Sequence, residues 1–202
     1  MKTTMKIGFW SAVLTAFFGL AFIAAALLEI AGLISGPERF IPLMLPSFFL
    51  APAFVVLMSS IYLYAPEDKK IWGLCGLGFA LIYAALITIV YFTQLSFVLP
   101  NLIKGEAEKV APFLFIGSDS FMFGLDVLGY GFMSLATLFS AFVFAGTRLR
   151  NWVRYFMLAN GLLAPLIPLE MFWPALIYPA GLWIITFPGA TILLAILFKQ
   201  EA

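Results

Sequence analysis

Six long apolar segments, separated by short polar breaks, form the dominant pattern of this chain. Each has about 20 residues or more, the length that an α-helix needs to cross a bilayer. We therefore predict an all-α, polytopic membrane protein with six transmembrane helices, forming one helical-bundle domain over residues 1–202. Only Phe172-Trp173-Pro174 separates the last two spans, which predicts a tight helical hairpin. The predicted spans are 8–34, 43–65, 71–99, 119–147, 152–173 and 175–198.

Lys and Arg residues predict the orientation of these spans. With an even number of spans, both termini lie on one side of the membrane, and that side would carry Lys2, Lys6, Lys69, Lys70, Arg148, Arg150, Arg154 and Lys199. The other side would carry only Arg39, Lys104 and Lys109. Because basic residues concentrate in cytoplasmic loops, we predict cytoplasmic N- and C-termini. The first apolar segment exceeds the roughly 7–15-residue core of a signal peptide, so we expect it to remain as a span.

Composition excludes several classes of function. The chain is 64% hydrophobic and 10% charged, whereas soluble domains have about 25% charged residues. Its net charge of +1 argues against nucleic-acid binding, which needs clustered basic residues. With no histidine and one cysteine, Cys75, the chain has no basis for a Cys- or His-ligated metal or haem. We predict no metal and no cofactor; the predicted partner is the lipid bilayer, and a small-molecule or ion ligand and a homo-oligomer are both compatible with the sequence.

Four carboxylates lie inside or at the edges of the apolar segments, with no Lys, Arg or His beside them there: Glu29, Asp119, Asp126 and Glu170. A charged acid at the centre of a membrane helix costs roughly 2.5–3.5 kcal/mol on insertion scales. All four map to the half of the bundle remote from the termini. This placement predicts an acidic, outward-facing cavity closed towards the cytoplasm by apolar packing.

Helical phase adds further residues to this site. At about 100° per residue, Asp126, Tyr130 and Thr137 lie within about 20° of the direction of Asp119, which forms a polar stripe on the fourth span. Gln94 and Tyr83 share a face of the third span. The predicted ligand-binding residues are Asp126, Asp119, Glu29, Tyr130, Gln94 and Glu170.

A simpler interpretation stays open for each acid. Glu29 and Glu170 are near enough to helix ends to reach interfacial water, and Asp119 suits a helix N-cap. On that view Asp126 alone is intramembrane, protonated and hydrogen-bonded to Tyr91, Tyr130 or Gln94. Five prolines interrupt the last two spans, which is typical of broken helices that line a cavity, although proline is also common in membrane helices. They are Pro165, Pro168, Pro174, Pro179 and Pro188.

Three stretches carry a resemblance to a known group of proteins: Leu125–Ala136, Tyr64–Trp72 and Tyr91–Leu95. They resemble segments of small multi-pass membrane proteins of bacteria and archaea, a family with no assigned activity. The resemblance implies a six-span helical protein of a prokaryotic plasma membrane, in which the Asp126 segment is a landmark. It implies no substrate and no reaction.

Three functions fit these observations. The first is a small transporter or channel for a proton, a cation or a small cationic or amphipathic solute, because buried acids can couple proton movement to binding. The second is a non-catalytic partner or sensor subunit that uses its polar stripes for helix association. The third is an enzyme acting on a lipid or isoprenoid with a carboxylate as acid or base. The missing histidines favour a non-enzymatic role, and the transporter is the leading hypothesis.

Overall fold

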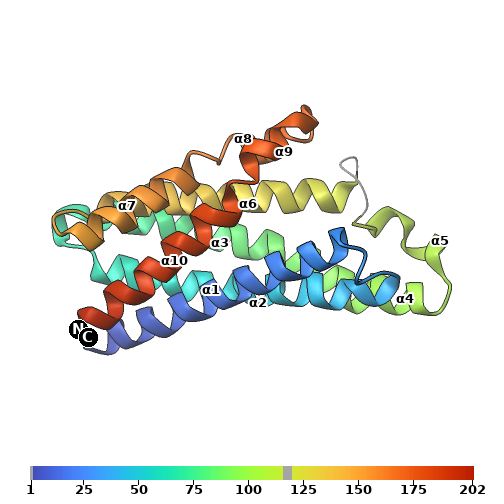
Figure 1. Cartoon of the computed structure of the whole chain (residues 1–202), viewed down its shortest axis with the longest axis horizontal. Coiled ribbons are helices and arrows are strands. Elements are labelled where there is room, and N and C mark those ends of the chain that lie inside the picture. Colours follow the sequence, from blue (N-terminus) through green and yellow to red (C-terminus); the bar gives the residue numbers. More distant parts are fainter. Residues whose placement is uncertain (1, 116–119) are drawn as a thin grey trace.

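The computed structural model describes residues 2–115 and 120–202, and this part of the chain is helical without a strand. Figure 1 shows the long helices running along one common axis, with the N- and C-termini together at one end. We call this the termini end and the opposite one the far end. The helices are α1 (Lys2–Ile30), α2 (Phe40–Tyr64), α3 (Lys70–Thr93), α4 (Leu99–Ile103), α5 (Ala107–Val110), α6 (Phe121–Ser140), α7 (Arg148–Gly161), α8 (Leu166–Leu169), α9 (Ile177–Ala180) and α10 (Trp183–Gln200).

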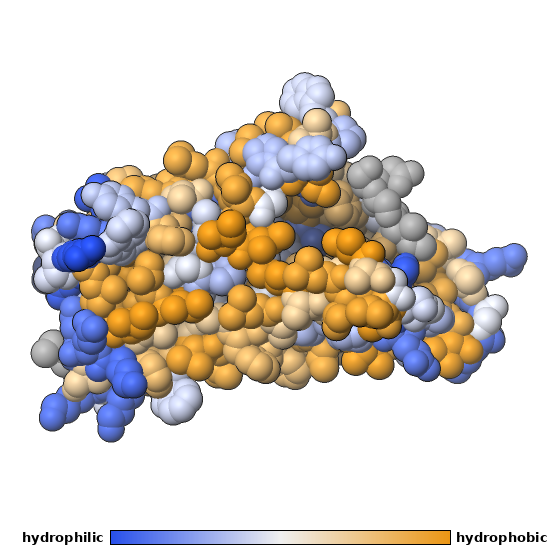
Figure 2. Space-filling view, viewed as in Figure 1, coloured by the Kyte–Doolittle hydropathy of each residue, from blue (hydrophilic) through white to orange (hydrophobic). Residues whose placement is uncertain are grey.

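The prediction of an all-α, six-span fold is confirmed. Among the described residues, six helical segments are long and apolar enough to cross a membrane. They are Lys2–Ile30, Pro37–Tyr64, Glu67–Ile103, Phe121–Val143, Arg148–Leu169 and Pro174–Gln200. Figure 2 shows hydrophilic atoms gathered at the two ends and a hydrophobic surface between them. The chain is therefore a multi-pass integral membrane protein.

Side-by-side packing orders the helices around the bundle. α1 lies against α2 and α10, α3 lies against α2 and α6, and α7 lies against α6 and α10. Fully buried side chains fill the half nearer the termini end, among them Leu57, Ile61, Phe144 and Phe198. The interior of that half is a packed core, and a pocket of about 510 Å³ at its outer end is lined by Tyr64, Arg150 and Glu201.

The fifth span is the largest departure from the prediction. We predicted a helix over 152–173, but α7 ends at Gly161, and short helices α8 and α9 lead to α10 at Trp183. Pro165 explains the break, because a proline lacks the N–H that would bond to the carbonyl four residues back, here that of Gly161, and its ring clashes with it. Residues 162–182, where the last two spans meet, are therefore broken into short helices and turns instead of two continuous helices, and Figure 1 shows this segment standing off the long helices.

Polar contacts at the termini end join distant parts of the chain. Arg150 donates to Glu201 Oε1 from Nε at 3.1 Å and from Nη2 at 3.0 Å, and the Tyr64 hydroxyl donates to Glu201 Oε2 at 3.0 Å. The last residues are thus tied to the start of α7 and the end of α2. The shared end agrees with the even number of spans; which side is cytoplasmic remains a prediction.

Candidate functional site

A cavity with two adjacent lobes lies in the far half of the bundle. The larger, about 440 Å³, has Glu29, Arg39 and Asp126 on its walls, and we call it the Arg39 lobe. The smaller, about 270 Å³, has Asp126 and Glu170 on its walls, and we call it the Glu170 lobe. Phe22, Phe123, Asp126 and Ile177 line both lobes, so they adjoin. Three of the four predicted acids therefore converge on one place.

The cavity reaches the surface on the flank of the bundle. Figure 2 shows a recess below the α8–α9 segment, with hydrophilic atoms at its floor and hydrophobic atoms around its rim. Residues of α8, α9 and the start of α10 line the Glu170 lobe, among them Ile167, Ala180 and Ile184. The proline-rich break between the last two spans thus forms one wall of the cavity.

Asp126 is the central group of this cavity. It lies one turn into α6, which begins after the N-cap Ser120, whose hydroxyl accepts a hydrogen bond from Phe123 N at 3.1 Å. The residue is only 8% exposed, and its Oδ1 has no hydrogen-bond partner among the described residues. A buried polar atom without a partner loses solvation without compensation, so such an atom in a native structure calls for an explanation.

Tyr130, one turn after Asp126 on α6, belongs to a buried chain of hydroxyl groups. It follows Asp126 by four residues, so the two share a face of α6. The Tyr130 hydroxyl lies 3.3 Å from the Tyr91 hydroxyl and donates to Ser47 Oγ at 3.4 Å. This chain joins α6 to α3 and α2 and fixes the Tyr130 ring on the cavity wall. Of the predicted stripe on this helix, Asp126, Tyr130 and Thr137 are buried.

Glu29 differs from the prediction because it has a basic partner. Arg39 Nη1 lies 3.3 Å from Glu29 Oε1, and both side chains are partly exposed. The pair connects the end of α1 to the start of α2 across the first far-end loop. The apolar segment that contains Glu29 has no basic residue of its own, but the loop after it brings Arg39 back beside Glu29. The charges of this pair offset each other in the Arg39 lobe.

Glu170 lies at the opposite end of the cavity. It follows α8, between the fifth and sixth spans, and is half-buried. Burial raises the pKa of the Glu170 carboxyl above its usual value, because desolvation disfavours the charged form. Asp119, the remaining predicted acid, lies outside the described residues.

Both polar atoms of the Gln94 side-chain amide have hydrogen-bond partners in the protein. It is fully buried at the start of a π-helical turn, Gln94–Val98. Its Nε2 donates to the Phe113 carbonyl at 2.7 Å, and its Oε1 accepts from Phe115 N at 3.2 Å. The side chain therefore fixes the far-end loop to α3, and we assign it no contact with a ligand.

Removing this amide should loosen the far-end loop. We expect Gln94→Ala to increase the rate of tryptic cleavage after Lys104 and Lys109 several-fold, because residues 113–115 lose their anchor on α3. Asn101→Ala is the matched control, since among the described residues Asn101 Nδ2 bonds only to the Phe97 carbonyl within the same helical region. Unchanged cleavage in Gln94→Ala, measured by mass spectrometry of the digest, would contradict the anchoring role.

Asn160 is a buried polar residue that the search for acids missed. It is fully buried at the end of α7, where its Nδ2 donates to Thr137 Oγ1 at 3.0 Å. Its Oδ1 accepts from Thr186 Oγ1 at 3.0 Å, so one amide joins α6, α7 and α10. The sequence signal that could have predicted this network is an asparagine within an apolar span. The network lies on the termini side of Trp183 and supports the helices that carry the cavity.

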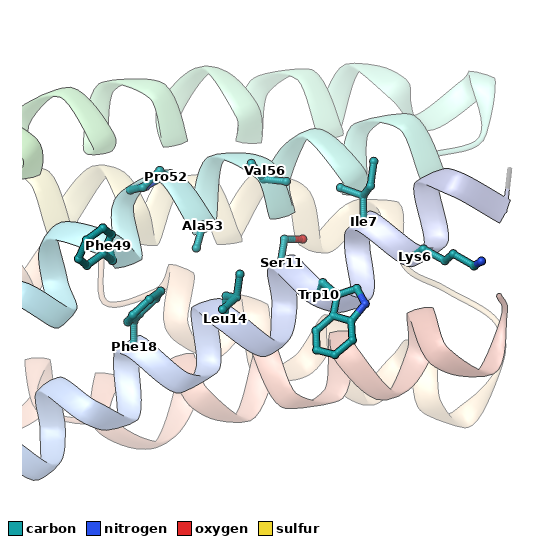
Figure 3. Close-up of a pocket in the computed structure, with 10 residues that line it drawn as sticks. All are labelled: Lys6, Ile7, Trp10, Ser11, Leu14, Phe18, Phe49, Pro52, Ala53 and Val56. Carbon is teal, nitrogen blue, oxygen red and sulfur yellow. The ribbon is translucent and has the colours of Figure 1, made fainter.

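A second hollow lies elsewhere and has no acidic residue on its walls. Figure 3 shows a groove between α1 and α2, whose labelled side chains include Trp10, Phe18 and Phe49. It measures about 570 Å³, and its charged residue, Lys6, is at the termini end. Trp10 and Phe49 are exposed on its walls, as expected of a surface that faces lipid. The buried acids therefore favour the far-end cavity as the functional site, although this groove is larger than either of its lobes.

Metal binding has no support in the part of the chain that the structure describes. No cluster of three or more Cys, Asp or Glu side chains there is placed to hold a metal ion.

No family model, no curated protein and no solved structure matches this chain. The resemblance to small bacterial and archaeal membrane proteins therefore remains a prediction.

Proposed function

We propose that this membrane protein is a small transporter that binds a cation or a small cationic, amphipathic solute in the far-end cavity, in the plasma membrane of a prokaryote. The buried carboxylate of Asp126, on the wall shared by both lobes, is the observation that carries this proposal. The Asp126 Oδ1 atom has no hydrogen-bond partner among the described residues, and a buried acid in a membrane is costly, so a cation that pairs with this oxygen supplies the missing interaction.

The one-sided shape of the cavity supports transport. The lobes occupy the far half, while apolar side chains such as Leu57 and Phe198 close the termini half. A transporter needs a site that opens to one side of the membrane at a time. The broken segment between α7 and α10 borders the site, and such interruptions are common at the binding sites of transporters.

Uptake into proteoliposomes tests this function. We expect the purified protein to accelerate the movement of at least one of three probes: tritiated tetraethylammonium, sodium ions, or protons followed with an internal pH dye. Protein-free liposomes of the same lipid are the control. If the protein moves none of the three probes, with and without an imposed proton gradient, the proposal is wrong.

A further inference from the structure

We propose that the Glu170 lobe is an aromatic cage for an organic ammonium group, in which Asp126 supplies the negative charge. This inference rests on the proposed function and names the class of its substrate: small alkylammonium cations. The cage consists of Phe22, Phe123, Tyr130 and Trp183, all of which line the lobe together with Asp126.

Charge distinguishes the two lobes. The Glu170 lobe carries two carboxylates, Asp126 and Glu170, and no Lys or Arg among its described lining residues. The Arg39 lobe carries the guanidinium of Arg39, which is paired with Glu29. A cation is attracted by the uncompensated acids and repelled by the guanidinium. It should therefore bind in the Glu170 lobe, on the side of Asp126 away from Arg39.

The aromatic rings stand as walls around Asp126. The rings of Tyr130 and Trp183 have centroids 5.5 Å apart and an interplanar angle of 85°. Phe22 meets Trp183 at 6.2 Å and 82°. Two such right-angled pairs place Phe22, Trp183 and Tyr130 as neighbouring sides of the proposed cage. Trp183 is held in place by stacking on Phe187, at 5.2 Å and 10°.

Such a box suits an alkylammonium better than a metal ion. Ring faces attract a cation by their quadrupole, and this attraction recognises quaternary ammonium groups, whose alkyl surface also prefers apolar walls. Hard metal ions prefer several oxygen ligands, and the described residues hold no cluster of three acids. The lobe of about 270 Å³ is close to the lower limit of typical small-molecule pockets, roughly 300 Å³, which fits a compact head group.

Binding to the full-length protein in nanodiscs tests the cage independently of transport. The probe is tritiated tetraethylammonium, and the competitors are choline and its neutral isostere 3,3-dimethylbutan-1-ol. We expect choline to compete at least about tenfold better than the isostere, since the two differ in charge and hardly in shape. The proposal is wrong if choline and the isostere compete equally well. It is also wrong if sodium chloride competes as strongly as choline chloride. Both outcomes are measured on the wild-type protein.

Substitutions of Trp183 and Phe22 then measure the contribution of the aromatic rings to binding. Trp183→Leu should weaken tetraethylammonium binding about fivefold, whereas Trp183→Phe should keep most of the affinity because a ring face remains. Phe22→Leu, at a half-buried position on another helix, provides a second measurement if Trp183→Leu does not fold. An equal loss for choline and for the neutral isostere in these variants would show a packing role alone and overturn the cage.

The outcomes separate this inference from the proposed function. Binding of tetraethylammonium with the expected selectivity, but without uptake, supports the cage and contradicts the transporter. Uptake of sodium ions or protons without tetraethylammonium binding supports the transporter and contradicts the cage.

Discussion

Asp126→Asn is expected to reduce the uptake of a cationic probe at least about thirtyfold while the protein remains folded. The substitution keeps the size of the side chain and its ability to form hydrogen bonds, but it removes the negative charge. Truncating one member of a buried charge pair typically costs about 2–5 kcal/mol, and the lower value corresponds to about thirtyfold. The measurement is the initial rate of tritiated tetraethylammonium uptake into proteoliposomes, normalised to the amount of incorporated protein.

Asp68→Asn provides a matched control for this experiment. Asp68 lies in the short 3-10 helix Glu67–Lys69 at the termini end and is exposed, so the same chemical change should leave uptake unaltered. Thermal unfolding of the Asp126→Asn protein checks folding, and we expect no loss of stability because the uncompensated buried charge is gone. Wild-type uptake in a well-folded Asp126→Asn protein would remove the main support for the transport site.

The long apolar runs determined the fold strongly enough to be predicted. Length alone identified six spans, and their even number placed both termini at one end, because the bilayer imposes these constraints on any helical membrane protein. The end of α7 was predictable in principle, since Pro165 forbids the backbone hydrogen bond to Gly161. The prediction rested on the hydropathy of the whole segment, which does not detect such a local effect, so the predicted span continued to residue 173.

The partners of the site residues were not predictable in the same way. Helical phase placed Asp126 and Tyr130 on one face of α6, and the structure gives that face a cavity. Phase cannot say which distant segment lies opposite, so the approach of Trp183 and Phe22 to Asp126 had no signal in the sequence. The pairing of Glu29 with Arg39 depends on how the first loop turns back, at Gly36 with φ of +69°.

Gly161→Ala should destabilise the bundle more than any other single methyl-sized change near the site. A Cβ at this position would lie 2.5 Å from Leu138 Cβ and 2.6 Å from Leu138 Cα, so α7 would have to move away from the backbone of α6. Overpacking of this kind costs about 1–3 kcal/mol. The shift would also strain the adjacent Asn160, whose amide joins α6, α7 and α10.

The expected result is a fall in Tm of about 2–12 °C, on the scale of about 2–4 °C per kcal/mol for a chain of this size, measured by thermal unfolding in detergent. Gly78→Ala is the matched control, because no described atom comes within 4 Å of a Cβ added there, and alanine is the better helix former. We expect its Tm to be unchanged or slightly higher. Equal stability of the two variants would mean that close contact between α6 and α7 does not limit the packing of this bundle. The cavity wall formed after Gly161 would then owe its position to the prolines alone.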